Sequence, residues 1–131
     1  MSAGRRVHEG HAIVAVVDDD AGILQSLAYL LESADYAVHV YSSGAALLES
    51  NGLAKIDCLI SDIDMPGIDG FELLQAISVV RPDLPTILIT GYPDRLERIP
   101  ELGASQPRVF TKPFKGFELL AAVGESVGSR N

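Results

Sequence analysis

Short apolar runs alternate with segments of helical periodicity along most of the sequence, and this alternation restricts the fold more than any other feature. The runs are rich in β-branched residues, as buried strands are. They cover residues 11–17, 36–41, 58–60, 86–90 and 108–111. Helical spacing of apolar residues follows each run, at residues 20–34, 42–49, 70–78, 94–102 and 117–124. Five strands alternating with five helices predict an α/β fold, in which a parallel sheet carries helices on both faces.

Length and charge narrow the class of protein. A chain of 131 residues fits one domain, which we expect at residues 11–128 after a loose N-terminal arm at residues 1–10. The formal net charge of −8 argues against direct nucleic-acid binding, which needs a basic surface. The sequence has neither a signal-peptide pattern nor a membrane-spanning apolar run, so we expect no membrane insertion and a cytoplasmic location. The single cysteine, Cys58, lies in an apolar run and is interpreted as a core residue.

Three helices carry more specific predictions. Asp20 precedes the first helix and can accept hydrogen bonds from its free N–H groups as an N-cap. Pro100 falls inside the fourth helix, which we therefore expect to be short, kinked or split, with Leu96, Ile99 and Leu102 facing inward. In the final helix, the predicted inward face consists of Phe117, Leu120, Ala121 and Gly124.

Acidic and other polar residues stand where the predicted strands end. Asp18 and Asp19 follow the first run, Asp62 the third, Thr90 ends the fourth and Lys112 follows the fifth. In the doubly wound strand order 2-1-3-4-5, the first and third strands are neighbours. That order places Asp18 and Asp19 beside Asp62 at the rim where such sheets bind ligands.

This group of residues favours phosphoryl chemistry. Clustered carboxylates disfavour one another's ionisation and usually need a cation, and ligation by carboxylates and water suits Mg²⁺. Lys112 adds a positive charge and Thr90 a hydroxyl donor. A carboxylate nucleophile such as Asp62, together with these groups, can accept a phosphoryl group as an aspartyl phosphate.

Four segments of the chain resemble the receiver domain of two-component response regulators, which has a flavodoxin-like fold. They are VVDDD (Val16–Asp20), LISDIDMPGIDG (Leu59–Gly70), LITG (Leu88–Gly91) and TKPF (Thr111–Phe114). The resemblance implies that Asp62 is the phosphoacceptor, Thr90 the switch hydroxyl and Lys112 the ammonium that contacts the phosphoryl group. It also implies that Mg²⁺ binds Asp19 and Asp62 directly, Asp18 through water, and the backbone carbonyl of Asp64.

The same resemblance implies a cis Lys112–Pro113 peptide bond, and Asp64 and Tyr92 side chains that flank the attacking water during hydrolysis. It further implies a signalling protein rather than an enzyme, limited to self-phosphorylation from small donors and autodephosphorylation. We expect a stand-alone receiver, phosphorylated by a sensor histidine kinase or a histidine phosphotransfer protein, that acts on a downstream protein partner. Most receivers carry an aromatic residue where this chain has Val109, with Phe110 next to it.

Together with Pro100, this departure makes the face formed by the fourth helix, fifth strand and fifth helix atypical. Family members use that face for dimerisation and output.

Two other interpretations stay open. Asp62 and Asp64 match the DxD motif of haloacid-dehalogenase-like phosphatases, although that motif follows the first strand and this one the third. A receiver-like adaptor that acts without phosphorylation is the other alternative.

Overall fold

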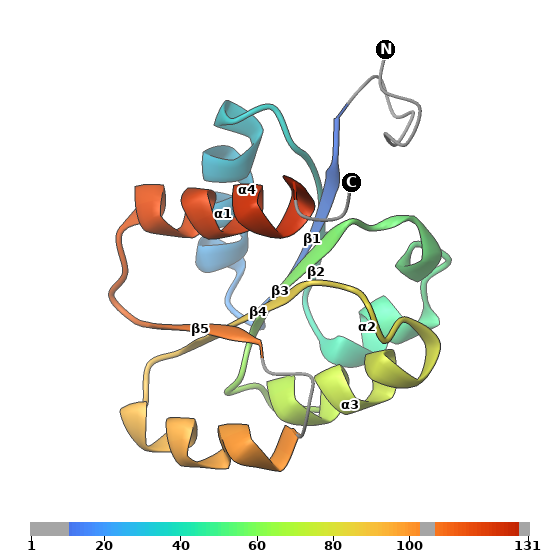
Figure 1. Cartoon of the computed structure of the whole chain (residues 1–131), viewed down its shortest axis with the longest axis vertical. Helices are drawn as coiled ribbons and strands as arrows, with labels where there is room; N and C mark the ends of the chain where they lie inside the picture. Colours follow the sequence, from blue (N-terminus) through green and yellow to red (C-terminus); the bar gives the residue numbers. More distant parts are fainter. Residues whose placement is uncertain (1–10, 103–106, 129–131) are drawn as a thin grey trace.

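A five-stranded parallel sheet forms the centre of the molecule (Figure 1). This computed structural model describes residues 11–102 and 107–128, without the side chains of residues 98–102; the expected N-terminal arm lies outside this part. The strands are β1 (Ile13–Val17), β2 (Ala37–Tyr41), β3 (Cys58–Asp62), β4 (Thr86–Thr90) and β5 (Arg108–Thr111). Their order, β2-β1-β3-β4-β5, confirms the predicted doubly wound topology.

The register of the strands brings their carboxyl ends to one rim. Val17 at the end of β1 pairs with Ser61 of β3, so Asp18 follows β1 beside Asp62. Asp62 in turn pairs with Ile89, one residue before the end of β4. Thr90 pairs with Thr111, directly before Lys112. The rim predicted from the strand ends is therefore present in the fold.

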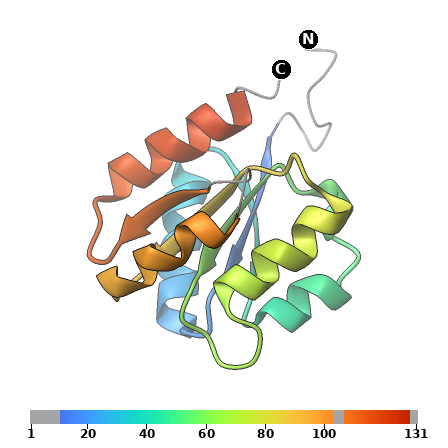
Figure 2. The ribbon, with the colours of Figure 1, turned by 60° about the horizontal axis from the view of Figure 1, so that its bottom comes forward.

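Helices cover both faces of the sheet (Figure 2). They are α1 (Ala21–Ser33), α2 (Gly44–Glu49), α3 (Gly70–Val80) and α4 (Gly116–Gly128), with 3₁₀ helices η1 (Leu53–Lys55) and η2 (Pro93–Leu102). Leu27 of α1 and Val123 of α4 pack on one face in a core cluster with Val16, whereas Leu47 of α2 and Leu73 of α3 pack on the other. Alternate residues of β1 supply the two clusters, since successive side chains of a strand point to opposite faces.

The fourth predicted helix takes a different form. Instead of a short, kinked or split α-helix, η2 is an unbroken 3₁₀ helix of 10 residues. Pro100 has no N–H group, so it would interrupt the hydrogen-bond ladder of an α-helix at this point. The prediction of an inward Leu96 was wrong, because this residue is 39% exposed. The side chains of Ile99 and Leu102, also predicted to face inward, lie outside the described part of the chain.

The inward face of the last helix was predicted wrongly except for Leu120, which is partly buried and packs against the core. Leu119, Ala122 and Val123 are buried, whereas Phe117 is 68% exposed. Residues 119–123 are all apolar, so their spacing leaves the rotation of the helix undetermined. The packing decides it: a Cβ at Gly116 would lie 3.3 Å from the side chain of Leu30, which brings the start of α4 against α1.

Caps and a close backbone approach shape the loops at the rim. Asp20 accepts hydrogen bonds from the backbone N–H groups of Gly22 and Ile23, at 2.8 and 3.2 Å, which confirms its predicted role as an N-cap. The loop after β3 returns so closely that a Cβ at Gly70 would lie 2.7 Å from the carbonyl oxygen of Asp62. Only glycine fits there, and the loop that follows Asp62 is held in place.

Candidate functional site

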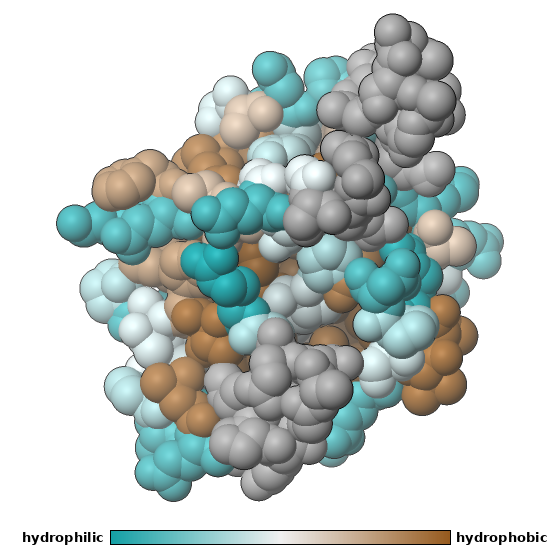
Figure 3. Space-filling model, viewed as in Figure 1, coloured by the Kyte–Doolittle hydropathy of each residue, from teal (hydrophilic) through white to brown (hydrophobic). Residues whose placement is uncertain are grey.

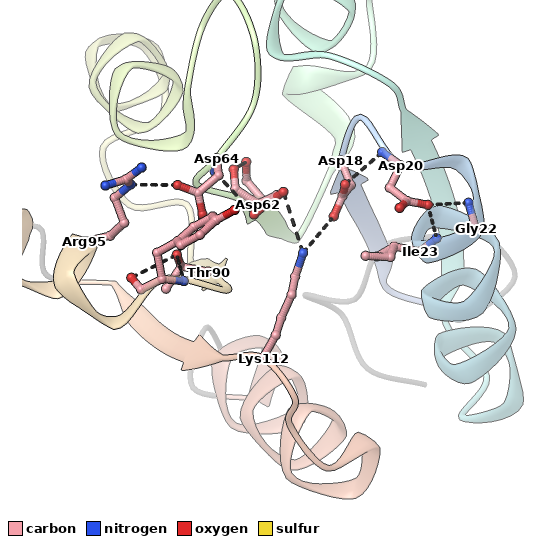
Figure 4. Close-up of polar contacts among 11 residues, drawn as sticks. Asp18, Asp20, Gly22, Ile23, Asp62, Asp64, Thr90, Arg95 and Lys112 are labelled. Atoms are coloured by element: carbon pink, nitrogen blue, oxygen red, sulfur yellow. Dashed lines mark hydrogen bonds and ion pairs between the residues drawn. The ribbon is translucent and has the colours of Figure 1, made fainter.

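The carboxyl ends of β1, β3 and β5 surround a hollow of about 390 Å³. Asp18, Asp19, Asp62, Asp64 and Lys112 line it. Residues separated by up to 94 positions in the sequence thus meet at one place, as the strand order predicts. Figure 4 shows Lys112 reaching from the end of β5 toward Asp62 and Asp18.

Three carboxylates form a group that could hold a metal ion. One oxygen each of Asp18, Asp19 and Asp62 lies within 4.8 Å of the others. Asp18 and Asp62 are buried, whereas Asp19 is exposed. Oxygen-only donors at this spacing, one of them open to solvent, fit a hard divalent cation that keeps some of its water.

Burial dominates the electrostatics of the two inner carboxylates. Removal from water, helped by the charge of Asp18, raises the pKa of Asp62 to about 6. Burial likewise raises the pKa of Asp18. The Nζ atom of Lys112 lies 3.7 Å from Oδ2 of Asp62 and 3.9 Å from Oδ2 of Asp18, and its charge opposes both shifts without cancelling them. A site of this kind gains stability from an added cation.

Backbone N–H groups orient the same carboxylates. The N–H of Asp20 donates to Oδ1 of Asp18 at 2.9 Å, and that of Asp64 donates to Oδ1 of Asp62 at 3.3 Å. In each case the outer oxygen, Oδ2, is the one that faces Lys112. The two carboxylates are therefore aimed at the hollow by the loops that follow their strands.

Thr90 contacts Asp64. The Thr90 side chain is buried at the end of β4, and its hydroxyl donates to Oδ2 of Asp64 at 2.8 Å. Oδ1 of the same carboxylate accepts a hydrogen bond from Nε of Arg95 at 2.7 Å. The Asp64 side chain thus bridges β4 and η2 (Figure 4).

Sequence reasoning missed Arg95. It lies in η2, 31 residues from Asp64, in a segment whose path from β4 no periodicity specifies. The only available signal was a basic residue shortly after the fourth strand, which is too common to single out.

The neighbourhood of Lys112 matches one sequence prediction. The Lys112–Pro113 peptide bond is cis, as expected. The N–H of Lys112 donates to the carbonyl of Thr90 at 2.7 Å, which ties the end of β5 to that of β4. Val109 packs with a small cluster that includes Phe71 and Leu88, whereas Phe110 lies on the other face of the sheet against Phe114, at 5.9 Å between ring centroids.

Comparison with known proteins identifies the family. The family model "Response regulator receiver domain" matches residues 14–124, so the chain belongs to the receiver-domain family of two-component signalling. These domains transmit signals rather than act as conventional enzymes. The helices of the described ranges are all too short or too polar to cross a bilayer.

Relatives and solved structures agree with that assignment. The transcriptional regulatory protein FixJ of Azorhizobium caulinodans is 35% identical over 115 residues, which cover 88% of this chain and 54% of that protein. The chain spans about half the length of the curated relatives it matches.

A response regulator receiver domain from Clostridium thermocellum superposes with a TM-score of 0.83 at 26% identity, covering 91% of this chain and 96% of that one. The chemotaxis protein CheY4 of Vibrio cholerae gives 0.78 at 28% identity, covering 88% and 98%.

Proposed function

We propose that this receiver accepts a phosphoryl group on Asp62 from a sensor histidine kinase or a histidine phosphotransfer protein. One observation carries the proposal: Asp62 is 5% exposed, yet its outer oxygen opens into the hollow, 3.7 Å from the ammonium of Lys112. A buried carboxylate that opens into a hollow beside a cation is arranged as a nucleophile.

Mg²⁺ fits the acidic end of the same hollow. Asp19 and Asp62 would hold it directly, Asp18 through water, and the backbone carbonyl of Asp64 would supply a further oxygen. When bound, the ion neutralises negative charge on the phosphoryl oxygens. The oxygen-only donor set and the raised pKa values of Asp18 and Asp62 support this assignment.

The chain's own residues carry the transfer. An oxygen of Asp62 forms a bond to phosphorus while the bond between phosphorus and the donor's imidazole nitrogen breaks, and the imidazole leaves with that electron pair. Lys112 neutralises charge on an equatorial oxygen. The Thr90 hydroxyl then turns to the new phosphoryl group, a two-state change of the kind that switches use.

The output of the switch is a protein partner. The face formed by η2, β5 and α4 mixes charged and apolar side chains (Figure 3), among them the exposed Leu96 and Phe117 and the ion pair between Arg108 and Glu125. We propose this face for partner binding or dimerisation. The relatives named as transcriptional regulators are about twice as long, so transcriptional regulation is a property of those proteins.

The test is the intact mass of the protein after incubation with acetyl phosphate and Mg²⁺. We expect wild type to gain one base-labile phosphoryl group, Asp62→Asn to gain none, and the exposed control Asp83→Asn to behave as wild type. A folded wild type that gains no phosphoryl group from acetyl phosphate or from a kinase would refute the proposal and favour the adaptor. Sustained turnover of a generic phosphoester would instead favour the phosphatase.

A further inference from the structure

The hydroxyl of Thr90 can donate one hydrogen bond, and Asp64 accepts it. Oδ2 of Asp64 lies 2.8 Å from the hydroxyl oxygen, whereas the carbonyl oxygen of Tyr92 lies at 3.3 Å. The shorter contact is also charge-assisted, so it is the stronger of the two. The hydroxyl's acceptor side is used as well, because the N–H of Tyr92 donates to it at 3.0 Å. Thr90 can reach a phosphoryl group only by releasing Asp64.

Arg95 holds in place the Asp64 carboxylate, which competes with a phosphoryl group for the hydrogen bond from Thr90. Its Nε donates to Oδ1 at 2.7 Å, which leaves Oδ2 turned to Thr90. The guanidinium also lies 5.3 Å from the centre of the Tyr92 ring, and the backbone N–H of Arg95 donates to the carbonyl of Tyr92 at 2.9 Å. Arg95 therefore contacts both residues, Asp64 and Tyr92, that we expect beside the attacking water.

We propose that Arg95 is a positioning residue: it holds Asp64 against Thr90, and the Thr90–Asp64–Arg95 chain stabilises the unphosphorylated conformation. Phosphorylation of Asp62 has to break the Thr90–Asp64 hydrogen bond before the Thr90 hydroxyl can turn to the phosphoryl group. The inference rests on the proposed function, because it assigns the phosphoryl group as the second acceptor for Thr90.

The charge of Arg95 affects the phosphoryl group less through direct attraction than by holding Asp64 in position. In Figure 4, Arg95 lies on the far side of Asp64 from Lys112, so Asp64 stands between its guanidinium and Asp62. The Arg95 side chain is 41% exposed, and solvent screens its charge at longer range. Loss of Arg95 therefore loosens Asp64 more than it weakens attraction of an anion to the hollow.

The experiment measures the affinity of the full chain for beryllium trifluoride, an analogue of the phosphoryl group, in the presence of Mg²⁺ by calorimetry. Arg95→Gln should bind about two- to fivefold more tightly than wild type, the range that a partly exposed ion pair allows. Lys55→Gln is the matched control, because it removes an exposed positive charge in η1, away from the rim and from the face formed by η2, β5 and α4, and its affinity should equal that of wild type. Equal or weaker binding by Arg95→Gln would overturn the proposal.

A double-mutant cycle with Thr90 separates positioning from a general effect on folding or charge. In a Thr90→Val background the hydrogen bond from Thr90 to Asp64 is absent, so Arg95→Gln should leave the affinity unchanged. If Thr90→Val does not fold, Thr90→Ala takes its place. An effect of Arg95→Gln that persists at full size without the hydroxyl would also overturn the inference. Wild type that neither binds the analogue nor gains phosphoryl mass would refute the proposed function and the inference with it, whereas phosphorylation without an Arg95 effect would refute the inference alone.

Discussion

Removing the charge of Asp62 tests the electrostatics of the site in a single substitution. In metal-free protein, burial and the charge of Asp18 raise the pKa of Asp62 from 3.8 to about 6. Between these two values the folded protein holds a proton that the unfolded chain has released, so the free energy of unfolding falls as pH rises through this window. Above about pH 6 the ionised Asp62 lowers the free energy of unfolding by the full amount, and below about pH 4 it does not lower it.

The magnitude follows from the shift. The difference between the two pKa values of Asp62 lowers the free energy of unfolding by about 3 kcal/mol at neutral pH, and by about 1.5 kcal/mol near pH 5, where Asp62 is mostly protonated in the folded state. Asp62 is 5% exposed, so solvent screening reduces this value little. Asparagine has the same shape and no charge. Asp62→Asn should therefore be more stable than wild type by about 2–3 kcal/mol at neutral pH and by about half of that near pH 5.

Urea unfolding followed by far-ultraviolet circular dichroism, in buffer containing EDTA, measures the difference at both pH values. Asp83→Asn provides the control, because Asp83 is exposed and distant from the rim, and its stability should match that of wild type. A variant Asp62→Asn that is no more stable than wild type at neutral pH would refute the reasoning. So would a stability gain that grows toward pH 5.

Three further predictions concern the ion, the loop after β3 and the lifetime of the phosphoryl group. Mg²⁺ should raise the melting temperature of wild type, and Asp19→Asn should lose most of that gain; an unaltered response would remove Asp19 from the ligand set. Gly70→Ala should lower the free energy of unfolding by about 1–3 kcal/mol in urea titrations, because its Cβ would meet the Asp62 carbonyl at 2.7 Å; an unchanged midpoint would contradict this. Exchanging the side chains at Asp64 and Tyr92 should change the rate at which phosphorylated protein loses mass, and an unchanged rate would show that neither side chain acts on the attacking water.

The sequence pattern predicts the bounds of some strands but not the rotation of the last helix. The bounds of β4 and β5 are those expected from the sequence, because proline and glycine bracket short β-branched runs there. The phase of α4 was not predictable, since the run of apolar residues at 119–123 offers several faces to the core. Its rotation depends on the close packing of Gly116 against Leu30 of another helix.

For the site, the strand pattern of the sequence was enough to predict which carboxylates and which lysine meet. Asp18, Asp62 and Lys112 each stand at the carboxyl end of a strand, and parallel strands in this order present their ends at one rim. The directions of the side chains on the loops depend on tertiary packing. The link from Thr90 through Asp64 to Arg95 depends on how η2 leaves β4, and a pairing across 31 residues between loops leaves no periodic trace in a sequence.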